Sequence, residues 1–393
     1  MITDQERKQR LERLKTLLSD ESLDAFLVTS TDSIYYLTGV SYMPLERPFF
    51  IIVRPDAPPE LLVPSLEVEH LRAAPNVDQV YSYWDYPSRE GEGWSEKLSI
   101  RLKGVSAFGV EPSLPQEIAD WLSDYHPRTL GLIERLRLVK SQAEVDMLRQ
   151  AAHYADLAVD ILLKHAYYGV SELELFSQGR AVQTQMLKEG PYEALASSVL
   201  VWAAPAPDNV QPHGVPNVAD RLRDGPHTAM SLIRRNGYAA ECERTFFLST
   251  PSEQERKAFA AMREARRRAF ELIRPGTPCA VIDQAAYGFL CDEGYGEYLL
   301  HRTGHGFGLG SHEGPWVAEG SSDVLAENML ISVEPGIYLP GVGGVRHSDT
   351  VLVTADGYER LTVFPTELEN LSLRAYRPIA RLWGGVMRRA VGI

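Results

Sequence analysis

Histidine and glycine are concentrated in one short stretch of the sequence, HRTGHGFGLGSHEGP at residues 301–315. Its three histidines, His301, His305 and His312, recur at intervals of four and seven residues. A neutral imidazole can take up or release a proton near pH 7 and can bind a metal ion. Glycines let the backbone come close to a ligand. The density of these two residue types therefore predicts a catalytic or binding site rather than a purely structural segment.

Another histidine and three carboxylates could complete such a site. His213 follows a proline, and Glu334 belongs to the segment VEPGIY. A neutral His213 could take a proton from water while a neighbouring carboxylate orients its ring. Without a metal ion, Glu241, Glu243 and Glu334 would form a strongly anionic pocket, in which repulsion raises their pKa values until a cation enters.

Three segments that open with Ser-x-x-Glu predict the helices that position this site. In this pattern the serine side chain accepts a hydrogen bond from a first-turn amide, and the glutamate bonds back to the amide of the serine. The predicted helices begin at Ser141, Ser171 and Ser252 and run to about His165, Lys188 and Ile273. Strand-like runs occur at residues 229–233, 237–248, 329–333 and 350–354. We therefore expect an α+β domain over residues 141–370, with helices covering an antiparallel sheet.

The first third of the chain alternates helix and strand patterns. Leucines at a helical period between residues 3 and 18 lead into a buried-strand pattern. Short β-branched and aromatic runs, separated by turn residues, lie at residues 23–30, 49–53, 60–63 and 79–83. This arrangement predicts an α/β domain over residues 1–135.

The last segment, residues 371–393, holds five arginines and no acidic residue; they are Arg374, Arg377, Arg381, Arg388 and Arg389. We expect this basic C-terminal segment to pack on the domain or on a second subunit. A polybasic membrane contact that includes Trp383 is the alternative.

The overall composition limits the classes of function. A formal net charge of -13 argues against a nucleic-acid partner, because phosphate binding needs clustered lysines and arginines. The three cysteines show no CxxC spacing, which indicates a reducing compartment. The charged, amphipathic N-terminus lacks signal-peptide features, and no run approaches the roughly 18 apolar residues of a membrane helix. We therefore predict a cytoplasmic protein with a small-molecule substrate and without nucleic-acid or membrane partners.

Several motifs together resemble the signature of the pita-bread hydrolases, which include prolidase, aminopeptidase P, methionine aminopeptidase and creatinase. They are HRTGHGFGLGSHE, VEPGIY, GGVRHSD, the triplet Pro212–His213–Gly214 and, in the first domain, IYYLTGV. These motifs fall in the family's order, and the similarity extends over about residues 141–365. The resemblance implies an α/β N-terminal domain, a pita-bread α+β C-terminal domain that carries the site, and a homodimer.

In this family the peptidases hold two metal ions with five ligands: two Asp, one His and two Glu. The resemblance places these positions on Met230, Glu241, His305, Glu334 and Ser348. A thioether and a hydroxyl cannot replace two anionic oxygens, so we predict no dinuclear site and no metal cofactor. A single divalent ion held by Glu241, His305 and Glu334, with an open position, is the alternative.

Other residues resemble creatinase, the metal-free member of the family. Glu243–Arg244–Thr245 matches its Glu-Arg-Thr, and the resemblance implies a catalytic set of His213, Glu243 and Glu334. Arg47 stands where creatinase supplies an arginine to the substrate carboxylate across the subunit boundary. Together with the anionic pocket, this resemblance implies a small zwitterionic substrate, such as a guanidino or amidine acid, whose C–N bond water attacks. In the peptidases the remaining polar positions bind peptide or assist proton transfer. We therefore predict catalytic roles for His213, Glu243, Glu334, His305 and His312, and substrate-binding roles for Arg47, Glu241, His301, Tyr338 and Arg346.

Three functions are compatible with these residues. The leading hypothesis is a metal-independent hydrolase that cleaves a C–N bond in a small zwitterionic compound. The second is an Xaa-Pro dipeptidase with an atypical or single-metal site. The third is a catalytically inactive binding homologue. All three share one fold, so only the site can separate them.

Overall fold

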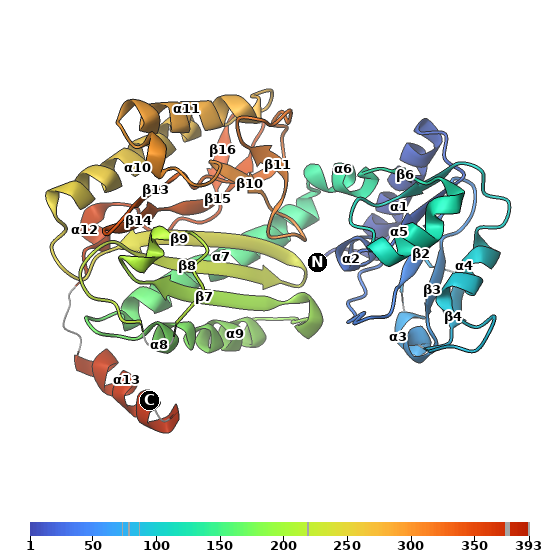
Figure 1. The fold of residues 1–393 in the computed structure, drawn as a ribbon, viewed down its shortest axis with the longest axis horizontal. Coiled ribbons are helices and arrows are strands. Elements are labelled where there is room, and N and C mark those ends of the chain that lie inside the picture. Colours follow the sequence, from blue (N-terminus) through green and yellow to red (C-terminus); the bar gives the residue numbers. More distant parts are fainter. Residues whose placement is uncertain (73, 78, 86, 218–219, 374–377, 392–393) are drawn as a thin grey trace. The chain divides into compact units, whose positions relative to one another are not determined.

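The computed structural model describes residues 1–393 except 73, 78, 86, 218–219, 374–377 and 392–393. The chain divides into two compact units, Met1–Arg137 and Leu138–Ile393. Each unit has its own sheet and its own helices (Figure 1).

Unit 1 contains a six-stranded mixed sheet in the order β4-β3-β2-β1-β5-β6. Its strands are β1 (Ala25–Val28), β2 (Phe50–Val53), β3 (Glu60–Pro64), β4 (Gln79–Tyr83), β5 (Phe108–Val110) and β6 (Arg128–Thr129). Its helices are α1 (Asp4–Asp20), α2 (Thr31–Thr38), α3 (Val68–Leu71), α4 (Trp94–Arg101) and α5 (Gln116–Leu122), while α6 (Leu132–Leu138) reaches the unit boundary.

The central strands of unit 1 are buried on both faces, as their continuous apolar runs predict. All four residues of β1 and all four of β2 are buried. Leu27, Phe50 and Leu62 share one core with Leu98 of α4 and Ile118 of α5. The predicted α/β character of this part of the chain is therefore correct.

Unit 2 contains an antiparallel sheet in the order β11-β10-β12-β15-β9-β8-β7, with β16 paired to β15 and a separate β13-β14 hairpin. Its strands are β7 (Ser198–Ala204), β8 (His227–Arg235), β9 (Tyr238–Phe246), β10 (Gly304–Gly306), β11 (Glu313–Val317), β12 (Leu330–Ser332), β13 (Gly336–Leu339), β14 (Gly343–Arg346), β15 (Ser348–Val353) and β16 (Tyr358–Arg360).

The predicted capping boxes at Ser141, Ser171 and Ser252 are all present. The helices of unit 2 are α7 (Gln142–His165), α8 (Glu172–Phe176), α9 (Gly179–Lys188), α10 (Glu253–Leu272), α11 (Cys279–Asp292), α12 (Leu368–Leu371) and α13 (Pro378–Val391). One prediction is wrong: the helix that begins after Ser171 is not continuous to Lys188 but divides into α8 and α9. Gly179, the first residue of α9, packs against Val199 and Val201 of β7.

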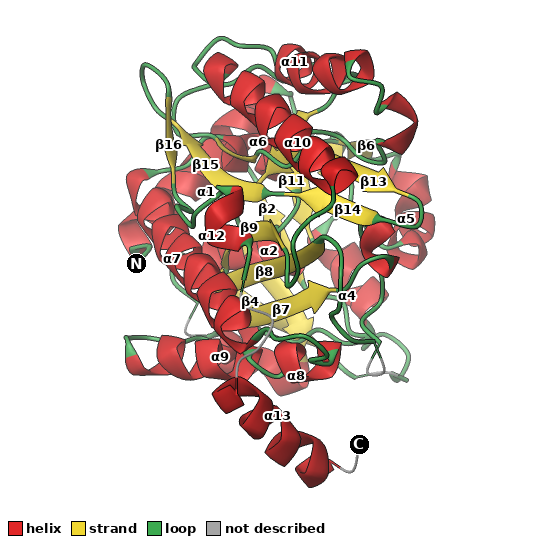
Figure 2. Cartoon of the chain, turned by 90° about the vertical axis from the view of Figure 1, so that its left-hand side faces the viewer, coloured by secondary structure: helices red, strands yellow, loops and turns green. Residues whose placement is uncertain are grey.

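The long helix α7 covers one face of β8 and β9 (Figure 2). Ala151 and Ala152 of α7 pack against Ala240 of β9, and these small side chains let the helix lie close to the sheet. The hydroxyl of Ser231 in β8 donates to the backbone carbonyl of Ala155, which also joins helix and sheet. Since neighbouring side chains of a strand point to opposite faces, the alternate residues of β9 point away from α7.

A buried ion network ties β9 to β15. Arg244 is fully buried and donates to Asp349 at 2.6 Å. It also donates to the backbone carbonyls of Ser348 and Phe364. Although burial alone would raise it, the charges of Arg244, Arg266 and Arg360 lower the pKa of Asp349 to about 2. Arg244 is therefore a structural residue that fixes the register of the two strands carrying the site.

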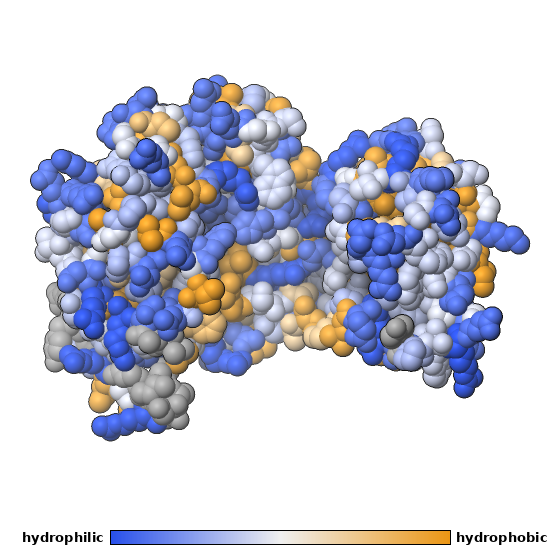
Figure 3. Space-filling model, viewed as in Figure 1, coloured by the Kyte–Doolittle hydropathy of each residue, from blue (hydrophilic) through white to orange (hydrophobic). Residues whose placement is uncertain are grey.

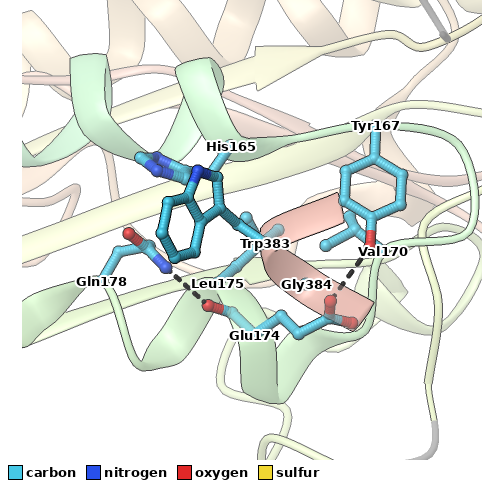
Figure 4. A pocket seen from close by; sticks show the side chains of 8 residues that line it. All are labelled: His165, Tyr167, Val170, Glu174, Leu175, Gln178, Trp383 and Gly384. Carbon is cyan, nitrogen blue, oxygen red and sulfur yellow. Dashed lines mark hydrogen bonds between the residues drawn. The ribbon is translucent and has the colours of Figure 1, made fainter. Parts of the chain in front are cut away.

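The helix α13 contacts α8 through Gly384, where an added Cβ would meet the carboxylate of Glu174. Figure 4 shows Trp383 and Gly384 beside Tyr167, Glu174 and Gln178. An apolar stripe on α13 remains exposed, formed by Ile379, Leu382, Trp383 and Val386. Gly384 thus packs on the domain, whereas the packing of the basic segment as a whole, on the domain or on a second subunit, stays a prediction. Arg374 and Arg377 lie outside the described residues.

Elsewhere on the face shown in Figure 3, hydrophobic residues are scattered among hydrophilic ones in both units. Isolated exposed apolar side chains of this kind are ordinary for a folded protein. Among the described residues, no helix has both the length and the apolar character needed to cross a membrane. Of the three cysteines, Cys242 and Cys279 are buried and Cys291 is exposed.

Candidate functional site

A cavity of about 240 Å³ lies within unit 2 and collects most of the predicted site residues. Strands β7, β8 and β9 form one part of its wall, and the segment that follows α11 forms another. Its lining consists of Trp202, His213, Met230, Ser231, Leu232, Glu241, Glu243, His301, Arg302, His305, His312, Glu334 and Arg346.

Strand register explains why the glutamates of β9 meet in this cavity. Glu241 and Glu243 are two residues apart and point to the face opposite α7. Glu243 pairs with Met230 of β8 on one side and with Ser348 of β15 on the other. Met230, Glu243 and Ser348 therefore stand in one row across three strands. The two positions that lack a carboxylate flank Glu243 directly.

Glu241, His305 and Glu334 converge as a buried trio. One potential ligand atom from each lies within 4.8 Å of the other two. His305 Nε2 is 3.0 Å from Glu334 Oε1 and 3.9 Å from Glu241 Oε1. The hydroxyl of Ser348 donates to Glu241 at 2.5 Å, and that of Ser332 donates to Glu334 at 3.0 Å. Each carboxylate is thus held in place by a serine.

The glycines of β10 allow this convergence. A Cβ on Gly304 would lie 2.1 Å from the backbone oxygen of Ser332, so only glycine fits there. The amide of His305 donates to the Ser332 hydroxyl. Its Nδ1 faces the carbonyl of Gly306 at 3.1 Å, which places a proton on Nδ1 and leaves Nε2 toward the carboxylates.

Electrostatics within the trio are strongly coupled. Burial and the charge of Glu334 raise the pKa of Glu241 to about 8. Burial alone would lower the pKa of His305, but the charges of Glu334 and Glu241 raise it to about 9. Burial alone would raise the pKa of Glu334, but the charge and hydrogen bond of His305 hold it well below its ordinary value. The predicted rise in carboxylate pKa is therefore wrong for Glu334, because His305 lies against it.

A second polar chain runs from Glu243 to His301. The guanidinium of Arg346 contacts both oxygens of Glu243, at 2.9 Å from Oε1, and also donates to the Tyr338 hydroxyl at 2.9 Å. Tyr338 lies 2.6 Å from His301 Nε2. Because His301 Nδ1 faces the carbonyl of Arg302 and carries the ring proton, Nε2 accepts a hydrogen bond from the Tyr338 hydroxyl. Burial, followed by the charge of Arg346, lowers the pKa of His301 to about 4.

The pocket is less anionic than the sequence predicts. Burial raises the pKa of Glu243 despite the opposing charge of Arg346. Arg346 nevertheless supplies a cation in direct contact with this carboxylate, and its Nη2 lies 3.8 Å from the sulfur of Met230. The predicted substrate-binding residue Arg346 is thus bonded to groups of the protein itself. Glu243 does not need a cationic substrate to balance its charge.

The other predicted residues are distributed differently. His312 lines the cavity with its ring centroid 4.0 Å from that of His305, and burial, followed by the charge of His305, lowers its pKa to about 4. His213 lines the same cavity from an exposed loop position. Arg47 belongs to unit 1, where it is paired with Asp85 at 2.7 Å and with Glu46 at 3.3 Å.

Sequence reasoning missed four lining residues: Trp202, Ser231, Leu232 and Arg302. Trp202 lies on β7, a strand that was not predicted. Ser231 and Leu232 carry no chemical signature of their own. Arg302 could have been found, because it directly follows His301 in the histidine-rich motif.

The donor set fits one divalent ion. Glu241, His305 and Glu334 offer two carboxylates and one imidazole, and an entering cation would displace the protons that now balance their charges. Among the residues that the structure describes, no other group of three or more Asp, Glu, His or Cys side chains brings its potential ligand atoms together as this trio does. Met230 and Ser348 supply no anionic oxygens for a second ion. The expectation of no metal cofactor finds no support here, whereas the single-ion alternative is compatible with the geometry.

Comparisons with known proteins agree with this geometry. The family description "Metallopeptidase family M24" matches residues 146–355, and "Creatinase/Prolidase N-terminal domain" matches residues 10–153. An uncharacterized peptidase of Staphylococcus aureus is 31% identical over 357 residues, covering 88% of this chain and 96% of the relative. A similar protein of Staphylococcus haemolyticus is 30% identical over 355 residues, covering 90% and 98%.

Solved structures give the same result. The prolidase from Pyrococcus horikoshii is 27% identical with a TM-score of 0.79, over 92% of this chain and 99% of that chain. The Xaa-Pro dipeptidase from Bacillus anthracis is 27% identical with a TM-score of 0.77, over the same shares. Dipeptidase PepE from Mycobacterium ulcerans has a TM-score of 0.82 at 26% identity, over 93% and 98%. The predicted resemblance and fold class are confirmed, and the chain is a hydrolase of metallopeptidase family M24 with a creatinase/prolidase N-terminal domain.

Proposed function

We propose that this protein is a dipeptidase of the Xaa-Pro type that works with a single divalent ion. The convergence of Glu241, His305 and Glu334 within 4.8 Å is the observation that carries the proposal. The similarity to a prolidase and to an Xaa-Pro dipeptidase, over 99% of each of those chains, supports the substrate class. An Xaa-Pro dipeptidase with a single-metal site is the second function that the sequence predicts. We now favour it over the metal-independent hydrolase of a small zwitterionic compound.

The protein's own residues supply binding and proton transfer. Glu334 is ionised and held by Ser332, so it can help to hold the ion and accept a hydrogen bond that orients the attacking water. The neutral rings of His312 and His301 face the cavity, where His312 can donate a hydrogen bond to the substrate carbonyl. His213, on the exposed side, can protonate the leaving nitrogen. A divalent ion, when bound by the trio, would lower the pKa of a bound water toward neutrality.

The Arg346–Glu243 pair argues against the metal-independent hydrolase of a cationic substrate. That hypothesis needed Glu243 to meet a cation brought by the substrate, and Arg346 already occupies its two oxygens. One observation still favours it as a second candidate: His213, Glu243 and Glu334 line one cavity. Tyr338, His301 and Arg346 would in either case stabilise the shape of the pocket.

The deciding experiment pairs elemental analysis with an activity assay. Purified protein is incubated with manganese, cobalt or zinc, desalted, and assayed for hydrolysis of Ala-Pro. We expect one ion per chain and cleavage that requires it. Glu241→Gln and Glu334→Gln should lose both, while Glu297→Gln, at an exposed position of the same unit, should keep both.

The other outcomes are equally informative. Two ions per chain would show that the ligand set extends beyond the trio. Absence of both metal and dipeptide cleavage, with hydrolysis of amidine or guanidino acids, would support the metal-independent candidate. Absence of any turnover would leave a binding homologue. We further propose a small-molecule substrate, a homodimer and a cytoplasmic location, without nucleic-acid or membrane partners.

A further inference from the structure

A buried ion pair lies directly beside the histidine-rich loop of unit 2. The side chain of Lys140 is only 1% exposed, and its Nζ donates to Glu313 Oε1 and to the backbone carbonyl of Leu138, each at 3.2 Å. Glu313 is the first residue of β11 and directly follows His312. Neither Lys140 nor Glu313 is among the residues that line the cavity. The pair therefore influences the site only through the residues next to it.

Glu313 anchors the loop 307–312, which connects β10 to β11. Its Oε2 accepts a hydrogen bond from the amide of Gly310 at 3.1 Å. Its Oε1 approaches Gly308 so closely that an added Cβ there would lie 2.2 Å away. The carbonyl of Gly308 in turn accepts from the amide of Ala239 in β9 at 2.8 Å. One carboxylate thus contacts the loop on one side and Lys140 on the other.

The loop needs an anchor of this kind. Its sequence, FGLGSH, contains two glycines, which allow the backbone many conformations. Among the described residues, the ring of His312 has no hydrogen-bond partner, and its centroid lies 4.0 Å from that of His305. The position of the His312 ring therefore depends on the backbone of the loop. Glu313 holds this backbone, and Lys140 holds Glu313.

We infer that Lys140 is a positioning residue for His312 and acts through Glu313. The inference rests on the proposed dipeptidase function, in which His312 donates a hydrogen bond to the substrate carbonyl. Lys140 balances the charge of Glu313, the carboxylate fixes the loop, and the loop directs His312 into the cavity. Removing one partner of a buried ion pair leaves the charge of the other uncompensated. Without Lys140, the carboxylate and the loop should therefore move together.

The first test measures kcat and KM for Ala-Pro in the presence of saturating divalent ion. Lys140→Met should lower kcat about 100-fold, the loss expected when a catalytic group is displaced by about 1 Å. KM and the number of bound ions should not change, because the pair touches neither substrate nor ion. Lys140→Arg keeps the cation and should recover most of the lost activity. Lys257→Met is the matched control: it breaks an exposed pair with Glu253 and should leave kcat unchanged.

A double variant separates positioning from a general structural role. In the background of His312→Ala, Lys140→Met should lower kcat no further, because the group that it positions is absent. Losses that multiply in the double variant would show that Lys140 acts by another route and would overturn the inference, as would an unchanged kcat in Lys140→Met alone. If Lys140→Met does not fold, Glu313→Gln, which removes the other charge and keeps the shape of the side chain, takes its place in both comparisons.

Nuclear magnetic resonance of carbon-13-labelled histidine rings gives a readout that needs no turnover. The signal of His312 is assigned by its absence from His312→Asn. In Lys140→Met this signal should shift, because the ring leaves its contact with His305, while in Lys257→Met it should stay in place. If the wild-type protein cleaves no dipeptide, the dipeptidase proposal fails, and this comparison alone decides whether Lys140 positions His312. An unchanged His312 signal in Lys140→Met would contradict the inference in either case.

Discussion

Met230 and Ser348 flank Glu243, and the family resemblance predicts carboxylate ligands of a second metal ion at these two positions. Restoring both anions should therefore restore the second ion. In Met230→Asp/Ser348→Glu we expect two bound ions per chain instead of one, because paired dications require several carboxylates to neutralise them. Elemental analysis after incubation with manganese measures the ratio. A ratio that stays at one, as expected for the control Met230→Leu/Ser348→Thr, would show that Arg346 excludes the second ion.

His227 gives a separate prediction about pH. It is fully buried; its Nδ1 accepts from the amide of Ala206 and its Nε2 faces the carbonyl of Arg223. Burial lowers its pKa from 6.5 to about 4. A depressed histidine pKa gives stability that is present above pH 6.5 and is lost as the pH falls toward 4. Between pH 7 and pH 5 this loss is about 2 kcal/mol.

Urea unfolding at the two pH values measures the effect. The difference in unfolding free energy should be about 2 kcal/mol larger for the wild-type protein than for His227→Gln, which does not titrate. Parallel curves for the two proteins would show that folding leaves the pKa of His227 near its ordinary value, and would contradict this prediction.

At the residue scale, the sequence predicted what motifs encode and missed what tertiary contacts create. His305 and Glu334 were found because each lies in a recognisable string, and Glu241 was found because the family resemblance places a ligand position there. The pairing of Glu243 with Arg346 was not, because these residues are far apart in sequence and meet only through the hairpin β13-β14 and the sheet. The low pKa of Glu334 was not predicted for the same reason, because it depends on the contact with His305 in the folded chain.

Strands β9 and β15 carry the site. Arg244 of β9 bonds Asp349 of β15 on the face of the sheet opposite Glu243 and Ser348. Replacing it by methionine would leave Asp349 with two of its three arginine partners and several carbonyls without a donor. We expect Arg244→Met to lower the free energy of unfolding by about 3 kcal/mol. In contrast, Arg263→Met breaks a partly exposed pair with Glu367 and should cost less than about 1 kcal/mol. Chemical denaturation measures both, and equal effects would refute the structural role of Arg244.

At the element scale, local signals were reliable where the capping chemistry is explicit. The helices after Ser141 and Ser252 begin at the predicted residues, since a capping box satisfies the free amides of the first turn. The helix α11 was missed because it starts after Pro278 without a side-chain cap. The strand β7 was missed because its short apolar run is ambiguous between helix and strand.

Each of the two units has a hydrophobic core of its own, and the whole trio belongs to unit 2. The fragment 138–393 should therefore fold alone and bind one divalent ion. Circular dichroism during heating and elemental analysis test the two statements, with the Glu334→Gln fragment as a control that folds but binds no ion. A fragment that shows no cooperative transition would mean that unit 2 depends on unit 1.

The order of α/β and α+β regions could be predicted at the scale of the whole molecule, because runs of alternating helix and strand patterns reflect burial within each domain. Assembly could not. The homodimer stays a prediction that sedimentation velocity can test, and the exposed apolar stripe of α13 has no partner in the described part of the chain that covers it. What covers a surface depends on a second molecule, which one chain's sequence does not encode.

The positions of the cysteines make the site strand observable without any substitution. Burial raises the pKa of the Cys279 thiol to about 12 and that of Cys242, which lies between Glu241 and Glu243, well above its usual range, while Cys291 is exposed. A maleimide at neutral pH should modify Cys291 within the first phase, because the thiolate is the reactive form. Peptide mapping separates the later modification of Cys242 from that of Cys279, and modification of Cys242 then reports each transient separation of β9 from α7. A divalent ion bound by the trio should slow the modification of Cys242. The modification rate of this native thiol would therefore measure how much of the protein has the ion bound.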